Sequence, residues 1–371
     1  MAYYTREQSR VYHGAVSERI IEGRVASSDS GKNLIDYLCG RFTYFGREQW
    51  LAQIADGRLL LNGAEAMPSQ GLGAGDLLSF RPAPLVEPTV PLRYGLAYED
   101  EDYLIANKPP LLPVHPSGIY FRNTLWTLLK QRLTDVHIIT RLDKETSGLV
   151  LVAKNAAAAR HAQEAQKTQS LEKRYLAAAY GAFPYGSLLA EGWLYPDDAS
   201  PVRKKRRYGA DFPATANTVH VIGSGSGDGS QATGGTRGSP PERCATGFRL
   251  MSSWQADEGP RSLIEARLLT GRTHQIRATL LSLGYPIVGD KLYGLDEGMF
   301  LRFIDDGLTE GDLKRLVLTY QALHCSLVSF TGADGRAVRA EAQPPWLQAL
   351  GIGKTSLDTA TLSGHMLRDG I

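Results

Sequence analysis

Apolar and polar residues alternate along much of the chain in the pattern of β-strands. Ile138–Lys154 comprises two short apolar runs joined by a polar turn, with Asp143 where the first run ends. Tyr98–Pro109 has the pattern of two strands around an acidic turn, and residues 264–268 alternate strictly. Leu171–Gly181 is rich in small residues and reads as a buried strand. Side chains along a strand point alternately to its two faces, so Lys173 and Tyr175 are expected on the same face.

Three other segments have the spacing of amphipathic helices. Apolar residues recur every three or four positions over Asn123–Leu133 and over His274–Leu283, which Gly284 ends. An alanine-rich helix is predicted from Ala156 to about Gln169, because Asn155 precedes it and asparagine commonly caps helix N-termini. The chain therefore contains predicted helices as well as predicted strands.

Residues 30–81 predict a small module of their own. Two short helices come first, and Gly57 ends the second. A strand follows, then the tight turn Asn62-Gly63, and Leu77–Phe80 forms a last strand. Four basic residues of this module can form one face that binds RNA: Lys32, Arg41, Arg47 and Arg58. The other possibility is a small accessory domain whose basic face is simply solvated.

Length and composition place these elements in a two-domain protein. The chain has 371 residues, a net charge of +2, 43% hydrophobic and 22% charged residues. The expected divisions are an N-terminal extension (1–29), the small module (30–81), a proline-rich linker (82–91), a main domain (92–350) with a low-complexity insertion (224–241), and a C-terminal tail (351–371). Three widely spaced cysteines suggest free thiols, and neither a signal peptide nor a membrane span is apparent, so a cytoplasmic protein is expected.

Several polar residues stand where they can do chemistry. Asp143 can act as a nucleophile or as an acid or base, or it can be a turn residue that bonds local backbone. Tyr175 beside Lys173 suits base stacking and anion pairing, or it can be an ordinary core aromatic.

Two groups of basic residues also stand out. The beginning of the predicted helix at His274 brings Arg272, His274 and Arg277 together in an electropositive corner, unless surface acids neutralise it. The basic run that contains Arg203, Lys204 and Lys205 can be a solvated patch or can grip phosphates.

Long stretches of the chain resemble a known family. TRLDKETSGLVLVAK, then KRYLAAAYG, then TGRTHQIRATLLSLGYPIVGDKLYG closely resemble the RluA-type pseudouridine synthases. Asn107-Lys108-Pro109 and Leu323-His324-Cys325 are similar to its early and late motifs. The N-terminal module resembles the small RNA-binding module named after ribosomal protein S-four, which also occurs in this family. The chain departs from the family pattern at Thr140, Ala278 and Thr279.

The resemblance implies an isomerase that converts uridine in RNA to pseudouridine without a metal or cofactor. The fold that it implies is α+β, a mixed and mostly antiparallel sheet with flanking helices and a central cleft, plus a small α+β RNA-binding domain. Asp143 corresponds to the family's catalytic aspartate, Tyr175 to its active-site tyrosine and Arg277 to the basic partner of the aspartate. Asp143 would either attack the ribose carbon or remove a sugar proton. The substrate-binding residues that we expect are Arg141, Thr146, Ser147, Lys173, Arg272 and His274.

RNA is the partner that this reading implies, with ribosomal RNA favoured and transfer RNA second. A monomer is expected, with no membrane association. Two alternatives stay open at the level of the sequence. One is a non-catalytic RNA-binding or assembly protein, and the other is a hydrolase that uses Asp143 and His274.

Overall fold

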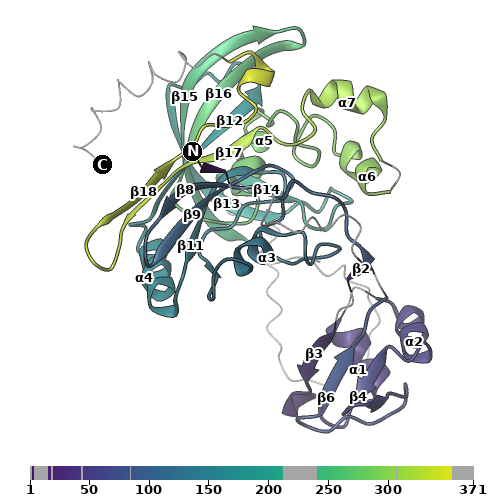
Figure 1. Ribbon diagram of the computed structural model, residues 1–371. Helices are drawn as coiled ribbons and strands as arrows, with labels where there is room; N and C mark the ends of the chain where they lie inside the picture. The colour runs from purple at the N-terminus through teal and green to yellow at the C-terminus, as the bar shows by residue number, and fades with distance from the viewer. Residues whose placement is uncertain are drawn as a thin grey trace. The chain divides into compact units, whose positions relative to one another are not determined.

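The computed structural model describes residues 2–3, 16–17, 20–42, 45–83, 85–211, 240–305 and 307–352 (Figure 1). The predicted insertion at 224–241 and the predicted tail at 351–371 therefore lie almost entirely outside the described residues. The chain divides into two compact units. The main unit comprises Met1–Arg10, Val90–His115 and Thr124–Ile371, and the N-terminal unit comprises Val11–Thr89 and Pro116–Asn123.

The described part of the main unit is built on a 12-stranded sheet. Its strands are β1 (Ala2–Tyr3), β8 (Gly95–Glu99), β9 (Tyr103–Lys108), β10 (His137–Ile138), β11 (Ser147–Ala153), β12 (Glu172–Tyr180), β13 (Ser187–Pro196), β14 (Arg206–Gly209), β15 (Glu242–Ala256), β16 (Gly259–Leu268), β17 (Leu323–Thr331) and β18 (Ala337–Glu341). The order is β1-β8-β9-β11-β17-β12-β16-β15-β13-β14, with β10 beside β11 and β18 beside β17. Neighbouring strands run antiparallel except β11 and β17, which are parallel. The predicted mixed, mostly antiparallel α+β fold is confirmed.

Helices pack beside this sheet or extend from it. They are α3 (Leu125–Lys130), α4 (Ala156–Lys167), α5 (Gln275–Ser282), α6 (Gly298–Asp305), α7 (Glu310–Leu316) and the 3-10 turn η3 (Gln348–Leu350). The Asn155 side chain accepts the Ala158 N–H at 2.8 Å, which is the predicted N-terminal cap of α4. The helix predicted at Asn123–Leu133 is shorter than expected, because Thr124 caps it and it ends at Lys130. In Figure 1, α4 lies near β11, whereas α6 and α7 project beyond the sheet.

The strand that follows Asp143 lies at the centre of the core. All seven residues of β11 are buried, and they pair with β9 on one side and β17 on the other. The predicted first strand of the hairpin is reduced to His137–Ile138, so Asp143 lies in a loop rather than at the end of a strand. Gly148 has φ +109°, and a Cβ there would lie 2.3 Å from the Cys325 carbonyl oxygen. Glycine therefore allows the chain to pass from this loop into the parallel pairing.

The N-terminal unit has a smaller core around the buried Trp50. Its elements are η1 (Ser27–Asp29), α1 (Leu34–Arg41), α2 (Arg47–Ala55), β2 (Val16–Ser17), β3 (Ile21–Arg24), β4 (Leu59–Leu61), β5 (Ala64–Glu65), β6 (Leu77–Phe80) and β7 (Leu85–Val86). The predicted start at residue 30 is too late, because β3 pairs with β6 in the sheet β3-β6-β4-β5. All four residues of β3 are exposed, so it lacks the apolar alternation by which strands are predicted.

The predicted linker at 82–91 and the predicted start of the main domain at 92 also need correction. β7 lies within the linker range and pairs with β2. The buried Glu87 carboxylate accepts the backbone N–H groups of Phe121, Arg122 and Asn123 at 2.8–2.9 Å. A buried carboxylate requires such donors, and these bonds tie residues 116–123 to the N-terminal unit.

Candidate active site

The loop that carries Asp143 is fixed from two sides. The Thr140 hydroxyl accepts the Leu151 N–H at 2.9 Å, and the Thr146 N–H donates to the Asp143 carbonyl at 3.1 Å. The side chain of Lys108 also contacts this loop, through the Lys144 carbonyl. Its buried ammonium donates to the carbonyls of Pro109 and Leu112 at 2.9 Å and of Lys144 at 3.1 Å. Three carbonyl acceptors match the three protons of a lysine ammonium, although burial lowers the pKa of Lys108 to about 7.

Arg277 on α5 joins Asp143 to a second carboxylate. Its Nη1 donates to Asp143 Oδ2 at 2.7 Å, while Nε and Nη2 bond both oxygens of Asp290 at 2.6 and 2.9 Å. The Asp290 side chain is fully buried and also accepts the N–H groups of Leu292 and Tyr293. The bidentate pair leaves the guanidinium little rotational freedom, so it presents one N–H to Asp143.

Asp143 is held in its ionised form. Burial alone would raise the pKa of its carboxyl group, but the Arg277 charge and its hydrogen bond outweigh that effect. The pKa of Asp143 therefore lies below the ordinary aspartate value. About 35% of its side chain is exposed, so the charged carboxylate remains open to a ligand.

His274 lies beside the same carboxylate and is neutral. Burial lowers its pKa to about 4, and Arg277 adds to the effect. The Tyr293 hydroxyl accepts the Arg206 N–H at 2.9 Å and also lies 2.9 Å from His274 Nδ1. The other ring nitrogen of His274, Nε2, lies 3.9 Å from Asp143 Oδ1.

Tyr175 contributes an aromatic ring to the site. Tyr175 lies on β12 and pairs with Ala266 of β16 on one side and with Cys325 of β17 on the other. Tyr175 is 6% exposed, and burial together with the neighbouring Cys325 raises the pKa of its hydroxyl well above the usual value. The tyrosine is therefore a neutral ring with a hydroxyl that can donate.

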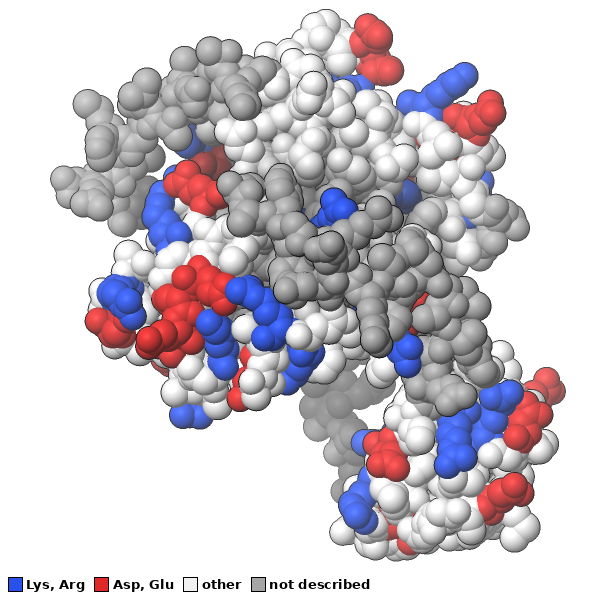
Figure 2. Space-filling model, viewed as in Figure 1, with Lys and Arg blue, Asp and Glu red and all other residues white. Residues whose placement is uncertain are grey.

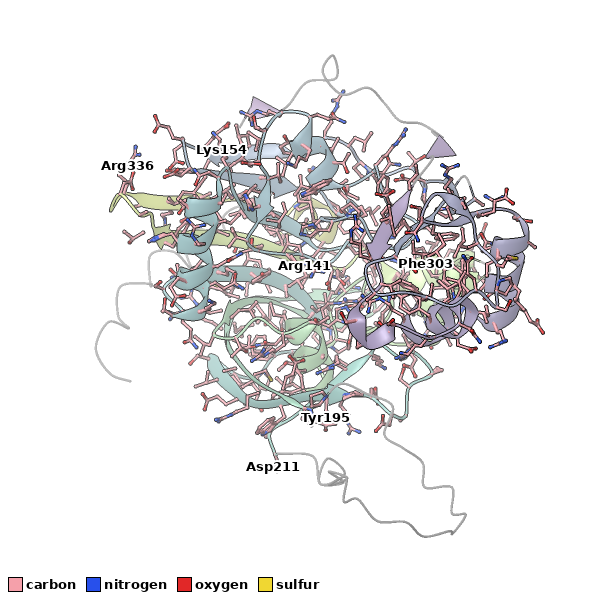
Figure 3. The ribbon with its side chains drawn as sticks, turned by 90° about the horizontal axis from the view of Figure 1, so that it is seen from below. Arg141, Lys154, Tyr195, Asp211, Phe303 and Arg336 are labelled. Carbon is pink, nitrogen blue, oxygen red and sulfur yellow. The ribbon has the colours of Figure 1, made fainter. Side chains whose placement is uncertain are left out.

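Most of the predicted site residues line one cavity of about 210 Å³. They are Arg141, Asp143, Thr146, Lys173, Tyr175, Arg272, His274 and Arg277. As predicted from strand alternation, Lys173 and Tyr175 share a face. Arg272 is partly neutralised, because its Nε donates to the Arg243 carbonyl at 3.2 Å and its Nη1 lies 3.5 Å from Glu242. Arg141 is exposed near the centre of the view in Figure 3.

Ser147 does not belong to this cavity. It is 1% exposed, and its hydroxyl lies 2.9 Å from His324 Nδ1 on the neighbouring strand β17. His324 Nε2 must donate to the Ala342 carbonyl at 3.1 Å, so Nδ1 accepts the Ser147 proton. The prediction of Ser147 as a substrate-binding residue is wrong, because its one proton is committed to the core.

The predicted RNA-binding residues have mixed surroundings. Lys205 is 8% exposed and pairs with Glu297 at 2.7 Å, so it does not belong to a solvated basic run with Arg203 and Lys204. Arg203 and Lys204 are exposed, and Lys204 lies over the Phe300 ring. In the N-terminal unit, acidic partners lie 2.7 Å from Lys32, 2.8 Å from Arg47 and 3.2 Å from Arg58, and Arg41 lies over the Phe42 ring. Figure 2 shows basic side chains interspersed with acidic ones on the visible face of this unit.

Sequence reasoning missed three residues that shape the site. They are Asp290, Tyr293 and Gln321. Asp290 orients Arg277, and Tyr293 bonds His274. The Gln321 amide bonds the Thr146 hydroxyl and Asp143. Asp290 and Tyr293 lie within the family-like stretch that ends in YPIVGDKLYG. A buried guanidinium is costly unless its charge is fully paired, and Asp143 is only partly buried, so Arg277 requires a second carboxylate. This requirement predicts an acidic partner such as Asp290.

The described residues contain neither a candidate metal site nor a candidate membrane-spanning helix. No group of three or more His, Cys, Asp or Glu side chains there could hold a metal ion. None of the helices in the described ranges is long and apolar enough to cross a membrane.

Comparison with known proteins identifies the family. Residues 102–282 match the family described as RNA pseudouridylate synthase. A tRNA pseudouridine(31) synthase of Saccharomyces cerevisiae is 30% identical over 294 residues, which cover 71% of this chain and 67% of that protein. The chain belongs to the RNA pseudouridine synthases. A second relative of this synthase, the ribosomal large subunit pseudouridine synthase D of Yersinia pestis, is 29% identical, with 74% of this chain and 76% of that protein covered.

A solved structure supports the fold of the synthase. Human RNA pseudouridylate synthase domain containing 1 superposes with a TM-score of 0.53 at 21% identity, covering 75% of this chain and 98% of that one. Membership of the RNA pseudouridine synthases, shown by the sequence matches, makes the protein an isomerase that acts on RNA.

Proposed function

We propose that the protein is an RluA-type synthase in which Asp143 carries out the isomerisation of specific uridines, with ribosomal RNA as its substrate. One observation carries this proposal: an ionised, partly exposed carboxylate lies in a cavity between a fixed arginine and a buried tyrosine ring. The reaction breaks the bond between the ribose C1′ and uracil N1 and forms one between C1′ and C5. N1 gains the proton that C5 loses, so the mass of the RNA does not change.

The roles that we propose follow from the positions of the side chains. The target uridine must leave its stack to reach the cavity, where Tyr175 stacks against the uracil. Asp143 then attacks C1′ or removes a sugar proton, and both routes require the charged form that Arg277 maintains. Arg141 and Arg272 at the cavity bind the phosphates of the flipped nucleotide, and Lys173, His274 and Thr146 contact the nucleotide.

The choice of ribosomal RNA rests on the N-terminal unit. Its two helices and the tight turn at Asn62-Gly63 after them support an S-four-like module, with β3 before the helices as an added strand. Lys32, Arg41, Arg47 and Arg58 would contact phosphates there, and Arg203 and Lys204 would do so on the main unit. Transfer RNA is the second candidate, because the yeast relative is named as a tRNA enzyme.

We further propose a cytoplasmic monomer. Free cysteines, two of them buried, suit a reducing compartment.

The test is a transcriptome-wide map of pseudouridine. Total RNA from cells that lack the protein is compared, by carbodiimide modification and reverse transcription, with RNA from cells rescued by wild type or by Asp143→Ala. A ribosomal site that disappears and returns only with wild type supports the proposal. A tRNA site with the same behaviour selects the second candidate. Restoration of a site by Asp143→Ala would exclude Asp143 as the catalytic group, and rescue of growth without any site would favour an assembly protein.

A further inference from the structure

Near its C-terminal end, helix α6 carries an aromatic residue, Phe303, that is not part of the buried core. Met299 is 2% exposed and packs in the interior, whereas Phe303 is 38% exposed and Ile304 is 59% exposed. Phe300 and Phe303 are three positions apart and therefore share a face of the helix. Phe300 packs against the edge of the main core, so the same face continues from the core to the surface at Phe303.

Lysine side chains gather on this face. The ammonium of Lys204 lies 4.7 Å from the centre of the Phe300 ring, and that of Lys144 lies 5.6 Å from the centre of the Phe303 ring. Lys144 directly follows Asp143 in the chain, so Phe303 lies beside the loop that carries the candidate carboxylate. Lys204 is close enough to Asp143 and Arg277 to interact electrostatically with both.

The position of α6 is fixed by ion pairs. Arg302 bonds Asp312 of α7 at 2.6 Å, and Asp296 accepts the Gly298 N–H at 2.8 Å at the beginning of the helix. The buried Lys291 ammonium lies 5.0 Å from the Phe303 ring centre. It also bonds the Glu145 carboxylate at 2.9 Å. These contacts hold Phe303 against the Asp143 loop.

We propose that Phe303, with Lys144 and Lys204, binds a nucleotide next to the target uridine. The flanking base stacks on the exposed part of the Phe303 ring, and the two ammonium groups bind its phosphates. An exposed ring among cations suits single-stranded nucleic acid, because every base has a π-face and every nucleotide carries a negative charge. Lysine is depleted at the centre of protein–protein interfaces, which argues against a protein as the occupant. The proposal rests on uridine in RNA as the substrate.

The experiment uses the full-length protein and a short transcript centred on the uridine that the mapping identifies. Pseudouridine formation is measured against RNA concentration for wild type, Phe303→Ala, Phe303→Leu and Phe303→Tyr. We expect the alanine and leucine variants to raise KM about 10-fold with kcat little changed, because stacking contributes to binding. The tyrosine variant should resemble wild type. Ile304→Ala, which removes a more exposed neighbour, is the matched control and should also resemble wild type.

A second series identifies the stacked base. Transcripts that carry an abasic residue at each flanking position in turn are given to wild type and to Phe303→Ala. At one position, loss of the base should raise the KM of wild type to that of Phe303→Ala and should not affect the variant further. Equal KM values for wild type and Phe303→Leu, or abasic effects that add to Phe303→Ala at every position, would overturn the inference. Absence of product with wild type would instead concern the proposed function, and thermal unfolding shows whether each variant folds.

Discussion

The charged side chains of the two units are arranged in contrasting ways. In the main unit, Arg277 is 8% exposed and is enclosed by the carboxylates of Asp143 and Asp290. In the N-terminal unit, Arg47 and Asp36 form a pair in which both side chains are more than half exposed. Buried charges must be paired, and they interact strongly in a medium of low polarity, whereas exposed pairs are screened by water and salt.

The contrast shows what each region can do. A buried network fixes the position of one N–H donor and of one carboxylate, and such fixed geometry suits the reaction that we propose for Asp143. Exposed pairs exchange partners at little cost, so they suit reversible contacts with phosphates at many positions. We therefore expect substitutions to have large, geometry-dependent effects in the buried network and small, salt-dependent effects in the N-terminal unit.

The largest effect is expected from Asp143→Asn. The amide keeps the size of the side chain but can neither attack as a carboxylate nor accept a proton, so turnover should fall by about 10³-fold or more. Single-turnover assays on the mapped RNA measure this loss, and filter binding should show nearly unchanged affinity. The control is Glu164→Gln on α4, whose exposed carboxylate pairs with Lys167 and does not line the cavity. Comparable losses in both variants would assign the effect to the loss of a negative charge in general rather than to Asp143.

Asp290→Asn should have the next largest effect. The variant leaves the buried Arg277 with Asp143 as its remaining carboxylate partner, and breaking a buried pair costs about 3–5 kcal/mol of stability. A guanidinium displaced by about 1 Å also lowers turnover by about 10²-fold. Urea unfolding and single-turnover rates measure the two effects separately. Asp334→Asn, which removes the exposed partner of Arg336, is the matched control and should change both little. Full activity of Asp290→Asn would show that Arg277 keeps its position without this partner.

Sequence patterns were sufficient to identify the residues to which we assign the chemistry in our proposal. Asp143, Tyr175 and Arg277 were placed by motifs, and strand alternation correctly put Lys173 and Tyr175 on one face. Such patterns specify which face a side chain occupies, because the period of a strand or helix is local. The helix after Asn155 was predictable for the same reason, since its cap and its alanines are neighbours in the chain.

Long-range partners could not be predicted in this way. Ser147 faces His324, which lies 177 positions away, and Lys205 meets Glu297 across 92 positions. No local period encodes such pairs, so Ser147 was expected in the cavity and Lys205 in solvent. The strand at residues 21–24 was missed because its side chains are exposed and it is held by backbone hydrogen bonds to β6.

A smaller effect is expected from the pH dependence of stability. Burial lowers the pKa of His274 from 6.5 to about 4, so the unfolded chain binds a proton in this range more readily than the folded one. Stability is therefore lost as the pH falls from 6.5 to 4, by about 3 kcal/mol for this group. His274→Gln should reduce the slope of unfolding free energy against pH in that window. His324, whose pKa burial lowers to about 3, contributes equally to both proteins. Identical slopes would mean that the pKa of His274 is the same in the folded and the unfolded chain.

The smallest effect is expected in the N-terminal unit, from a pair of matched lysines. Lys32 bonds Asp29 and Lys167 bonds Glu164, each three positions apart, and both lysine side chains are exposed. Lys32 belongs to the proposed RNA-binding face, whereas Lys167 lies on α4 of the main unit. Lys32→Gln should weaken RNA binding uniformly and reduce the slope of log K against log salt by about 1, because one phosphate contact is lost. Lys167→Gln should leave the slope unchanged, and neither variant should alter the melting temperature, because exposed pairs contribute little to stability. Equal slopes for Lys32→Gln and wild type would remove Lys32 from the proposed face, whereas a reduced slope in both variants would indicate a general effect of net charge.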